Sequence, residues 1–280
     1  MTLIESILAG RNPDGGWPYY AGKTSRLEPT AWALLALRAV GKDISLEPLQ
    51  TWPRRGAWFL DRSGDAVNIG INALGAIVLG ALVPEAPAGR ALAAALVEAR
   101  GMKLPQSPNF VQDNSLQGWP WTDGTFSWVE PTALAVIALK RHRGLPGADA
   151  RIGEGERLLL DRACQVGGWN YGNANALGRQ LEPHIPPTAL ALMALRDHRD
   201  TDVVRRSQRY LTSHPLDERS GLALALTRVA LGVLDNPGAA VAEALAEQWT
   251  RSAFLGNLHV TAMALYAQSA GATGYEAFRV

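Results

Sequence analysis

The sequence contains a single cysteine, Cys164, and no long apolar run. One thiol cannot form an internal disulfide, and a cysteine-based zinc site normally uses several thiolates, so a reducing compartment without structural zinc is favoured. No window approaches the roughly 18 uninterrupted apolar residues of a membrane-spanning helix. Segment 1–12 lacks a basic leader, so no signal peptide is expected. These absences predict a soluble, cytoplasmic protein that requires no metal and no other cofactor.

Charge of either sign is also scarce. The 27 Lys and Arg residues against 26 Asp and Glu residues leave a net charge of +1, and 47% of the residues are hydrophobic. There is no global field that would attract nucleic acid or an anionic membrane, so neither is expected as a partner. The basic runs at 140–143 and 205–206 are expected on solvated helix surfaces. The oligomeric state stays open.

Repeats dominate what is present. Three segments match one another: 25-SRLEPTAWALLAL-37, 127-SWVEPTALAVIAL-139 and 182-EPHIPPTALALMAL-195. Proline suits a first helical turn, and the following residues are apolar on nearly every face, which predicts buried helices. Weaker copies at 70–82, 219–231 and 259–268 bring the inner helices to six. Six outer, more amphipathic helices are expected at 2–9, 54–61, 88–99, 154–163, 203–212 and 238–251.

Strand signals are few, and the Ala and Leu content favours helix. An open solenoid needs capping repeats with a polar outer face, but the last inner segment is as apolar as the first. We therefore predict an all-α chain with one domain over 1–280, an α/α toroid of six helical hairpins. An open superhelix is the alternative. The stretches 84–89 and 144–155 are expected to be loops between repeats.

A Gly-Gly-Trp triplet recurs in 12-NPDGGWPYYAG-22 and 167-GGWNYG-172, with a shorter version, 118-GWPW-121, between them. The three are called the Gly-x-Trp turns, although the shorter one has Gln117 in place of the first glycine. Because the glycines and tryptophans recur with the repeats, their expected role is structural. The glycines turn the chain after an outer helix, and each indole packs and donates its N–H locally.

The order of helix end, Gln, Gly-x-Trp and apolar helix resembles the repeat of squalene and hopene cyclases, oxidosqualene cyclases and protein prenyltransferase β subunits. The clearest instances are 158-LLLDRACQVGGW-169 and 117-QGWPW-121. The resemblance covers the chain as repeats, and it implies a toroid with a hydrophobic, isoprenoid ligand or substrate. The Asp-x-Asp-Asp acid of protonating cyclases is absent. In 123-DGTFSW-128, which resembles a zinc-ligand segment of the prenyltransferases, Thr125 stands where their Cys would be, and a hydroxyl is a poor zinc ligand.

Candidate catalytic residues are those that break the repeat pattern. One position near the start of the inner helices reads Glu28, Gly70, Glu130, Pro186, Glu218 and His259 around the six repeats. If those helices are parallel, these residues form a ring at the helix amino termini. The glutamates then either compensate the helix dipole or act as an acid or cation-stabilising group at a pocket mouth.

Two further polar residues and an aromatic set complete the candidates. Asp123 lies in an aromatic-rich loop and is either a turn former or an acid, and His184 directly precedes a helix start. Aromatic faces after the Gly-x-Trp turns would stabilise a carbocation or stack on a sugar. The expected substrate-binding residues are Trp121, Trp128, Tyr171, Tyr20 and Phe126, with Tyr19 beside them.

Three hypotheses about function follow. The first is an isoprenoid-processing or isoprenoid-binding toroid in which Asp123, Glu28 or Glu130 acts as acid or cation stabiliser. The second is a non-catalytic toroid that binds a protein or a hydrophobic ligand. The third is a carbohydrate-active α/α toroid, a lyase or hydrolase, which would need paired carboxylates beside aromatic platforms.

Overall fold

The computed structural model of the chain describes residues 1–61, 66–106, 111–176, 178–214, 216, 220–269 and 275–280. Twelve α-helices lie within these residues, and the strands among them form only two hairpins of two-residue strands. The all-α prediction is confirmed at this level. The chain divides into two compact units, one made of Met1–Val67 with Pro215–Arg279 and the other of Asn68–His214.

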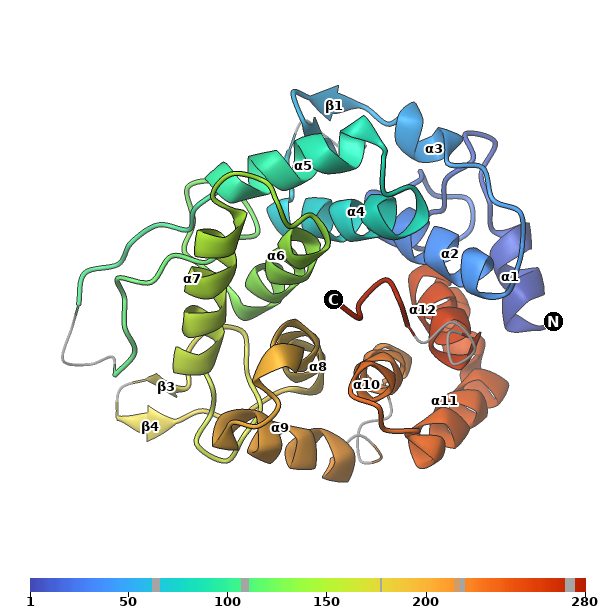
Figure 1. Cartoon of the computed structure of the whole chain (residues 1–280). Coiled ribbons are helices and arrows are strands. Elements are labelled where there is room, and N and C mark those ends of the chain that lie inside the picture. The colour runs from blue at the N-terminus through green and yellow to red at the C-terminus, as the bar shows by residue number, and fades with distance from the viewer. Residues whose placement is uncertain (62–65, 107–110, 177, 215, 217–219, 270–274) are drawn as a thin grey trace. The chain divides into compact units, whose positions relative to one another are not determined.

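The unit Asn68–His214 has two layers of helices (Figure 1). The apolar helices α4 (Ile69–Leu82), α6 (Val129–Arg141) and α8 (Ile185–Ala194) pack side by side in that order. The amphipathic helices α5 (Pro87–Glu98), α7 (Ala148–Asp161) and α9 (Asp202–Ser213) pack on α4, α6 and α8 respectively. The hairpin of β3 (Asn175–Ala176) and β4 (Arg179–Gln180) precedes α8 in the sequence, and the 3-10 turn η1 (Arg196–His198) follows α8.

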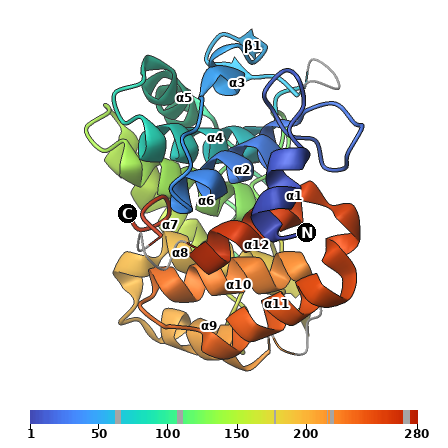
Figure 2. The ribbon, with the colours of Figure 1, turned by 90° about the vertical axis from the view of Figure 1, so that its right-hand side faces the viewer.

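The other unit repeats this arrangement with segments from both ends of the sequence. Helix α12 (Leu258–Ser269) lies between α2 (Leu27–Ala39) and α10 (Gly221–Val233), as Figure 2 shows. Helix α1 (Leu3–Ala9) packs on α12, and α11 (Ala239–Ser252) packs on α10 and leads through η2 (Ala253–Gly256) into α12. The short helix α3 (Glu47–Gln50) precedes the hairpin of β1 (Arg54–Arg55) and β2 (Trp58–Phe59).

The carboxy-terminal segment 275–279 covers apolar surface of this same unit. The ring of Phe278 is fully buried and stacks on Trp32 of α2 at a centroid distance of 5.2 Å. The hydroxyl of Tyr275 donates to the carbonyl of Ala267 in α12 at 2.9 Å. Arg279 donates to the carbonyl of Gly232 in α10 at 2.8 Å. The segment therefore bonds to two of the apolar helices and stacks on the third.

The Gly-x-Trp turns are held in the same way in all three strong repeats. The backbone N–H of each Trp donates to the hydroxyl of the fourth residue of the following apolar helix, at 2.9–3.0 Å. The indole N–H donates to a carbonyl near the end of the preceding amphipathic helix, at 2.6–2.8 Å. These bonds give the recurring tryptophans a structural role. The sets are Trp17 with Thr30 and Ile7, Trp119 with Thr132 and Leu96, and Trp169 with Thr188 and Leu159.

Replacement of Thr132 by valine tests this anchor. Valine keeps the shape of threonine but removes the acceptor of the buried Trp119 N–H, so we expect a loss of about 1–3 kcal/mol in the free energy of unfolding by urea. The matched control is Thr212→Val on α9, where the exposed hydroxyl bonds only to carbonyls of its own helix. That change is expected within about 0.5 kcal/mol of wild type. Equal stability of the two variants would contradict the anchoring role.

Two sequence predictions about local structure are wrong. Residues 54–61, expected to form an outer helix, contain the hairpin β1–β2 instead. Gly56 adopts φ +58° and so supplies the left-handed conformation that a tight hairpin turn needs. The stretch 144–155 is not all loop, since α7 begins at Ala148. Gly155 lies inside α7. A Cβ at this position would come within 2.6 Å of the Val136 side chain, so the glycine permits α7 to pack closely on α6.

The prediction that the basic run at 140–143 lies on a solvated helix surface is also wrong in part. Lys140 and His142 are buried, with 6% and 7% of their surface exposed. The Lys140 ammonium donates to the Ala194 carbonyl at 2.8 Å and forms ion pairs with Glu156 at 2.8 Å and Asp197 at 3.0 Å. Burial lowers the pKa of His142. The end of α6 therefore packs into the unit, and only part of this run faces solvent.

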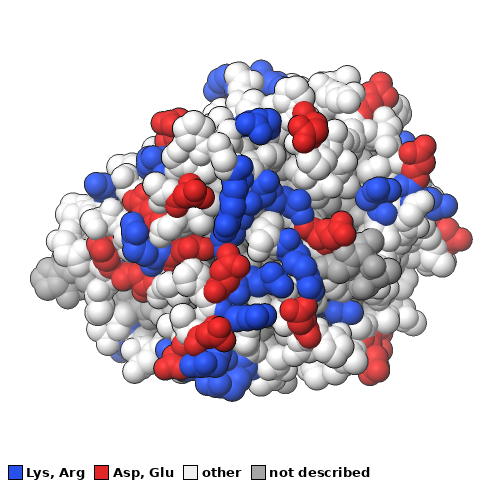
Figure 3. Space-filling view, viewed as in Figure 1, with Lys and Arg blue, Asp and Glu red and all other residues white. Residues whose placement is uncertain are grey.

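Side chains of both charge signs are exposed on the face drawn in Figure 3. Figure 3 shows acidic side chains interspersed among the basic ones on the face in view, in keeping with the net charge of +1. Among the described residues, none of the helices combines the length and apolar character needed to span a bilayer.

Candidate functional site

The three strong repeats each carry an aromatic residue two positions after the anchoring Trp: Tyr19, Trp121 and Tyr171. The backbone carbonyl of each accepts a hydrogen bond from the N–H of the first residue of another apolar helix, at 2.8, 2.8 and 3.0 Å. Those helices are α12, α4 and α6. The repeat thus brings an aromatic side chain to the amino-terminal end of a neighbouring apolar helix, where free N–H groups and the helix dipole favour negative charge.

In the unit that contains both chain ends, this arrangement brings Tyr19, Glu28 and His259 together. The Tyr19 hydroxyl donates a short hydrogen bond to the carboxylate of Glu28, in the first turn of α2. The rings of Tyr19 and His259 pack in an edge arrangement, with their centroids 5.6 Å apart and their planes at 82°. The Nε2 atom of His259 lies 3.8 Å from Oε1 of Glu28. We call these three residues the Tyr19–Glu28–His259 cluster.

Burial sets the protonation of two members of the cluster. The side chain of His259 is 8% exposed, and its Nε2 atom has no hydrogen-bond partner among the described residues. Burial lowers the pKa of His259, and the negative charge of Glu28 opposes this only in part. Burial also raises the pKa of Tyr19, and the charge and hydrogen bond of Glu28 raise it further. At neutral pH the cluster therefore contains a neutral imidazole and a neutral phenol beside a carboxylate, which gives it a negative potential.

The pH dependence of stability tests the state of His259. The folded protein holds its pKa below the ordinary value of 6.5, whereas the unfolded chain does not. As the pH falls below about 6.5 the unfolded chain binds the proton first, so the free energy of unfolding decreases as the pH falls from about 7. We expect His259→Gln to flatten this slope in urea titrations. Burial also lowers the pKa of His142, so that residue contributes to the same slope and His259→Gln is expected to flatten it only in part. A slope unaffected by His259→Gln would show that this residue titrates normally in the folded protein.

The surroundings of the cluster are polar on one side. Arg26, which directly precedes α2, forms an ion pair with Asp61 at 2.9 Å. Tyr20, the tyrosine expected to bind substrate, is 47% exposed, and its hydroxyl accepts from Asn257 at 3.3 Å. Its neighbour Tyr19 is the tyrosine that contacts Glu28 and His259. The repeat register contains the signal for this, because Tyr19 corresponds to Trp121 and Tyr171 and Tyr20 does not.

The unit Asn68–His214 contains the other candidates. His184 caps the start of α8, and its ring faces that of Tyr171 at 5.1 Å with a tilt of 32°. Trp128 occupies the equivalent cap position of α6 and stacks on Phe126 at 4.9 Å. Glu130, in the first turn of α6, is partly buried. These residues form aromatic surface at the amino-terminal ends of α6 and α8.

Trp121 and Asp123 are placed differently from each other. Trp121 packs on the first turn of α4, where a Cβ on Gly70 would come within 2.5 Å of the indole. Asp123 is exposed in a turn whose next residue, Gly124, has φ +73°. Within the described part of the chain the Asp123 carboxylate makes no hydrogen bond or ion pair. Glu218, from the ring proposed at the helix starts, lies outside the described residues.

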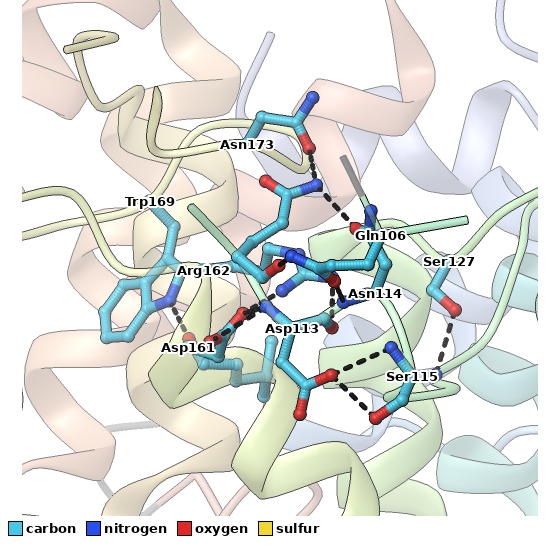
Figure 4. A network of polar contacts seen from close by, with 12 residues as sticks. Gln106, Asp113, Asn114, Ser115, Ser127, Asp161, Arg162, Trp169 and Asn173 are labelled. Carbon is cyan, nitrogen blue, oxygen red and sulfur yellow. Dashed lines mark hydrogen bonds and ion pairs between the residues drawn. The ribbon is translucent and has the colours of Figure 1, made fainter. Parts of the chain in front are cut away.

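A polar network supports the loop that carries Tyr171 (Figure 4). Gln112 donates to the side chain of Asn173 at 2.9 Å, and Asn170 donates to the carbonyl of the same residue at 2.6 Å. The backbone N–H of Asp113 donates to the Asp161 carboxylate at 3.1 Å, at the end of α7. These bonds tie the segment before the second Gly-x-Trp turn to the loop after the third, which fixes the backbone around Tyr171.

Over the described residues, no group of three or more His, Cys, Asp or Glu side chains is arranged to hold a metal ion. No family model matches the chain, and no curated protein matches it. The fold and the site thus define the class only as an all-α protein of repeated helical pairs, with polar and aromatic side chains at the amino termini of its apolar helices.

Proposed function

We propose that the chain is an α/α toroid that binds or converts an isoprenoid. The observation that carries the proposal is the Tyr19–Glu28–His259 cluster. Its carboxylate lies among aromatic rings and has no protonated base within the cluster, so its field favours a positive centre over an anion. A carbocation formed along an isoprenoid chain is such a centre. Glu28 would stabilise it or accept the proton that the cation loses at the end of a reaction.

The repeated hydrogen bonds of the Gly-x-Trp turns also support this proposal. The three Gly-x-Trp anchors bond identically, and each one carries an aromatic residue to the amino terminus of an apolar helix. Closure of six such hairpins into a ring would gather these ends around one cavity. The resemblance of the repeat to that of squalene cyclases and prenyltransferase β subunits points to a hydrophobic substrate. Within the unit Asn68–His214, the aromatic pairs Phe126–Trp128 and Tyr171–His184 offer apolar surface for such a substrate.

The direct test is incubation of the purified protein with farnesyl diphosphate, geranylgeranyl diphosphate and squalene. Products are analysed by mass spectrometry, and binding is measured by calorimetry on the same samples. Conversion of any of the three supports an enzyme, and saturable binding without conversion supports a non-catalytic carrier. Absence of both with all three compounds would refute the proposal.

A carbohydrate-active enzyme is the weaker alternative. It would need two available carboxylates about 5–10 Å apart. Asp61 acts electrostatically on Tyr19 and is therefore the second acid near the cluster, but it forms an ion pair with Arg26. The Asp61 carboxylate is therefore engaged by the Arg26 guanidinium and is not available to a substrate.

A further inference from the structure

A surface cavity of about 390 Å³ lies in the unit Asn68–His214, apart from every residue of the Tyr19–Glu28–His259 cluster. It forms where α9 approaches the third Gly-x-Trp turn, since a Cβ on Gly167 would come within 2.7 Å of the Arg206 backbone. Its wall consists mainly of α9 and the residue that follows it: Arg206, Arg209, Tyr210, Ser213 and His214.

The two arginines of this cavity have unused hydrogen-bond donors. Arg206 and Arg209 are three residues apart on one helix, so their side chains lie on the same face. The Nε–H of Arg206 is buried without a partner, and neither arginine forms an ion pair within the described part of the chain. Their neighbour Arg205, outside the cavity, is paired with Asp202 at 2.8 Å. A buried donor without an acceptor is destabilising, and a ligand with acceptor oxygens would satisfy it.

The other side chains of the wall are already oriented. The Tyr210 hydroxyl donates to the carbonyl of Pro183 at 3.0 Å, and the imidazole of His214 stacks on the Tyr210 ring at 4.2 Å. The Nδ1 atom of His214 lies 2.8 Å from the Ser213 hydroxyl and 3.0 Å from the carbonyl oxygen of Tyr210. One carboxylate, Glu182, also borders the cavity. Two guanidinium groups against one carboxylate leave the cavity with a positive charge.

We propose that this cavity binds a phosphoryl group. Guanidinium groups present several N–H donors in a planar fork that matches phosphate oxygens, and two on one helix face would engage a single phosphate together. The cavity volume falls in the range of small-molecule sites, about 300–1,000 Å³. The phosphoryl group belongs either to a soluble phosphate compound or to a lipid headgroup. This inference is independent of the proposed isoprenoid function, because it rests on different residues in the other unit.

The test is titration of the full chain with sodium pyrophosphate by calorimetry at constant ionic strength. The double variant Arg206→Gln/Arg209→Gln is expected to bind at least about 10-fold more weakly than wild type, a loss of about 1.4 kcal/mol. The matched control Arg205→Gln removes the same charge from the same helix outside the cavity and is expected to bind within about 2-fold of wild type. Vesicles with phosphatidic acid, compared with phosphatidylcholine alone, test the lipid source in a flotation assay.

Two results would overturn the proposal. One is absence of saturable binding of pyrophosphate and of phosphatidic acid vesicles to the wild-type chain. The other is equal weakening by Arg205→Gln, which would indicate general charge attraction. Because the stem of Arg206 is partly buried, the single variant Arg209→Gln, at an exposed residue, serves as a second test if the double variant does not fold. It is expected to weaken binding by about 3-fold or more.

Discussion

On the proposal that the chain converts an isoprenoid, replacement of Glu28 by glutamine is expected to lower the turnover by about 100-fold or more. Glutamine still accepts a hydrogen bond from Tyr19, so the geometry of the cluster is retained while its negative charge is removed. A positive centre formed during reaction would lose its counter-charge, and a departing proton would lose its acceptor. Because the Glu28 side chain is 27% exposed, we expect the free energy of unfolding to change by less than about 1 kcal/mol.

The measurement is kcat and KM for Glu28→Gln together with a urea titration of the same variant. The control is Glu47→Gln, an exposed glutamate in the first turn of α3, which also removes one carboxylate near a helix amino terminus. A lower kcat with KM and stability unchanged supports a role in the reaction. Parallel loss of activity and stability would instead assign Glu28 to compensation of the α2 dipole, the structural alternative raised by its position.

Tyr19→Phe separates the two groups of the cluster. This variant keeps the ring beside His259 but removes the hydroxyl that donates to Glu28. If the ring itself stabilises the positive centre, Tyr19→Phe is expected to retain much more turnover than Glu28→Gln. If the phenol proton takes part, the two variants are expected to lose turnover equally.

Lys140→Met is expected to cost about 3–5 kcal/mol of unfolding free energy, because it removes one partner of a buried ion-pair network. Methionine fills a similar volume, so the loss reports on charge rather than on a cavity. The Lys140 side chain is 1% exposed, and Glu156, with 14% exposure, would lose its ammonium partner and keep only His198 at 3.0 Å. Burial alone raises the pKa of Asp197, but the hydrogen bond and charge of Lys140 outweigh it and leave that pKa lowered.

Chemical denaturation of Lys140→Met beside Arg205→Met checks this expectation. Arg205 forms an ion pair with Asp202 in the same unit, but both side chains are more than half exposed. Exposed pairs contribute little, so Arg205→Met is expected to change stability by less than about 1 kcal/mol. If the two variants have the same stability, the Lys140 network makes no special contribution. The double variant Lys140→Met/Glu156→Gln is expected to recover part of the loss, because the unpaired carboxylate is then removed as well.

Lys140 also illustrates where sequence patterns are insufficient. A run of Lys, Arg, His and Arg at a helix end has the composition of solvated surface, and by local chemistry alone that is the natural reading. The outcome depended on η1 and α7, which bring Asp197 and Glu156 to the end of α6. The helix predicted over 54–61 was wrong for a similar reason. The apolar positions of this stretch fit a hairpin as well as a helix, and the positive φ of Gly56 allows the hairpin.

The sequence predicted individual residues of the candidate site, but not the contacts among them. Glu28 and His259 were recognised because they break a repeat and lie at helix starts, which is local information. Their contact with Tyr19 joins the two ends of the chain through the packing of α12 on α2. The burial that keeps His259 neutral likewise comes from packed neighbours and leaves no mark in the sequence around it.

The sequence by itself determined the apolar helices and the Gly-x-Trp turns, because both depend on residues close together in the chain: a proline start, an unbroken Ala and Leu run, and an indole anchored to the adjoining helices. Only the tertiary structure decided that Glu28 and His259 meet at Tyr19, that Lys140 is buried, and that Arg206 and Arg209 line one cavity. These features depend on which side chains distant in sequence come within a few ångströms, and helix packing alone sets those distances.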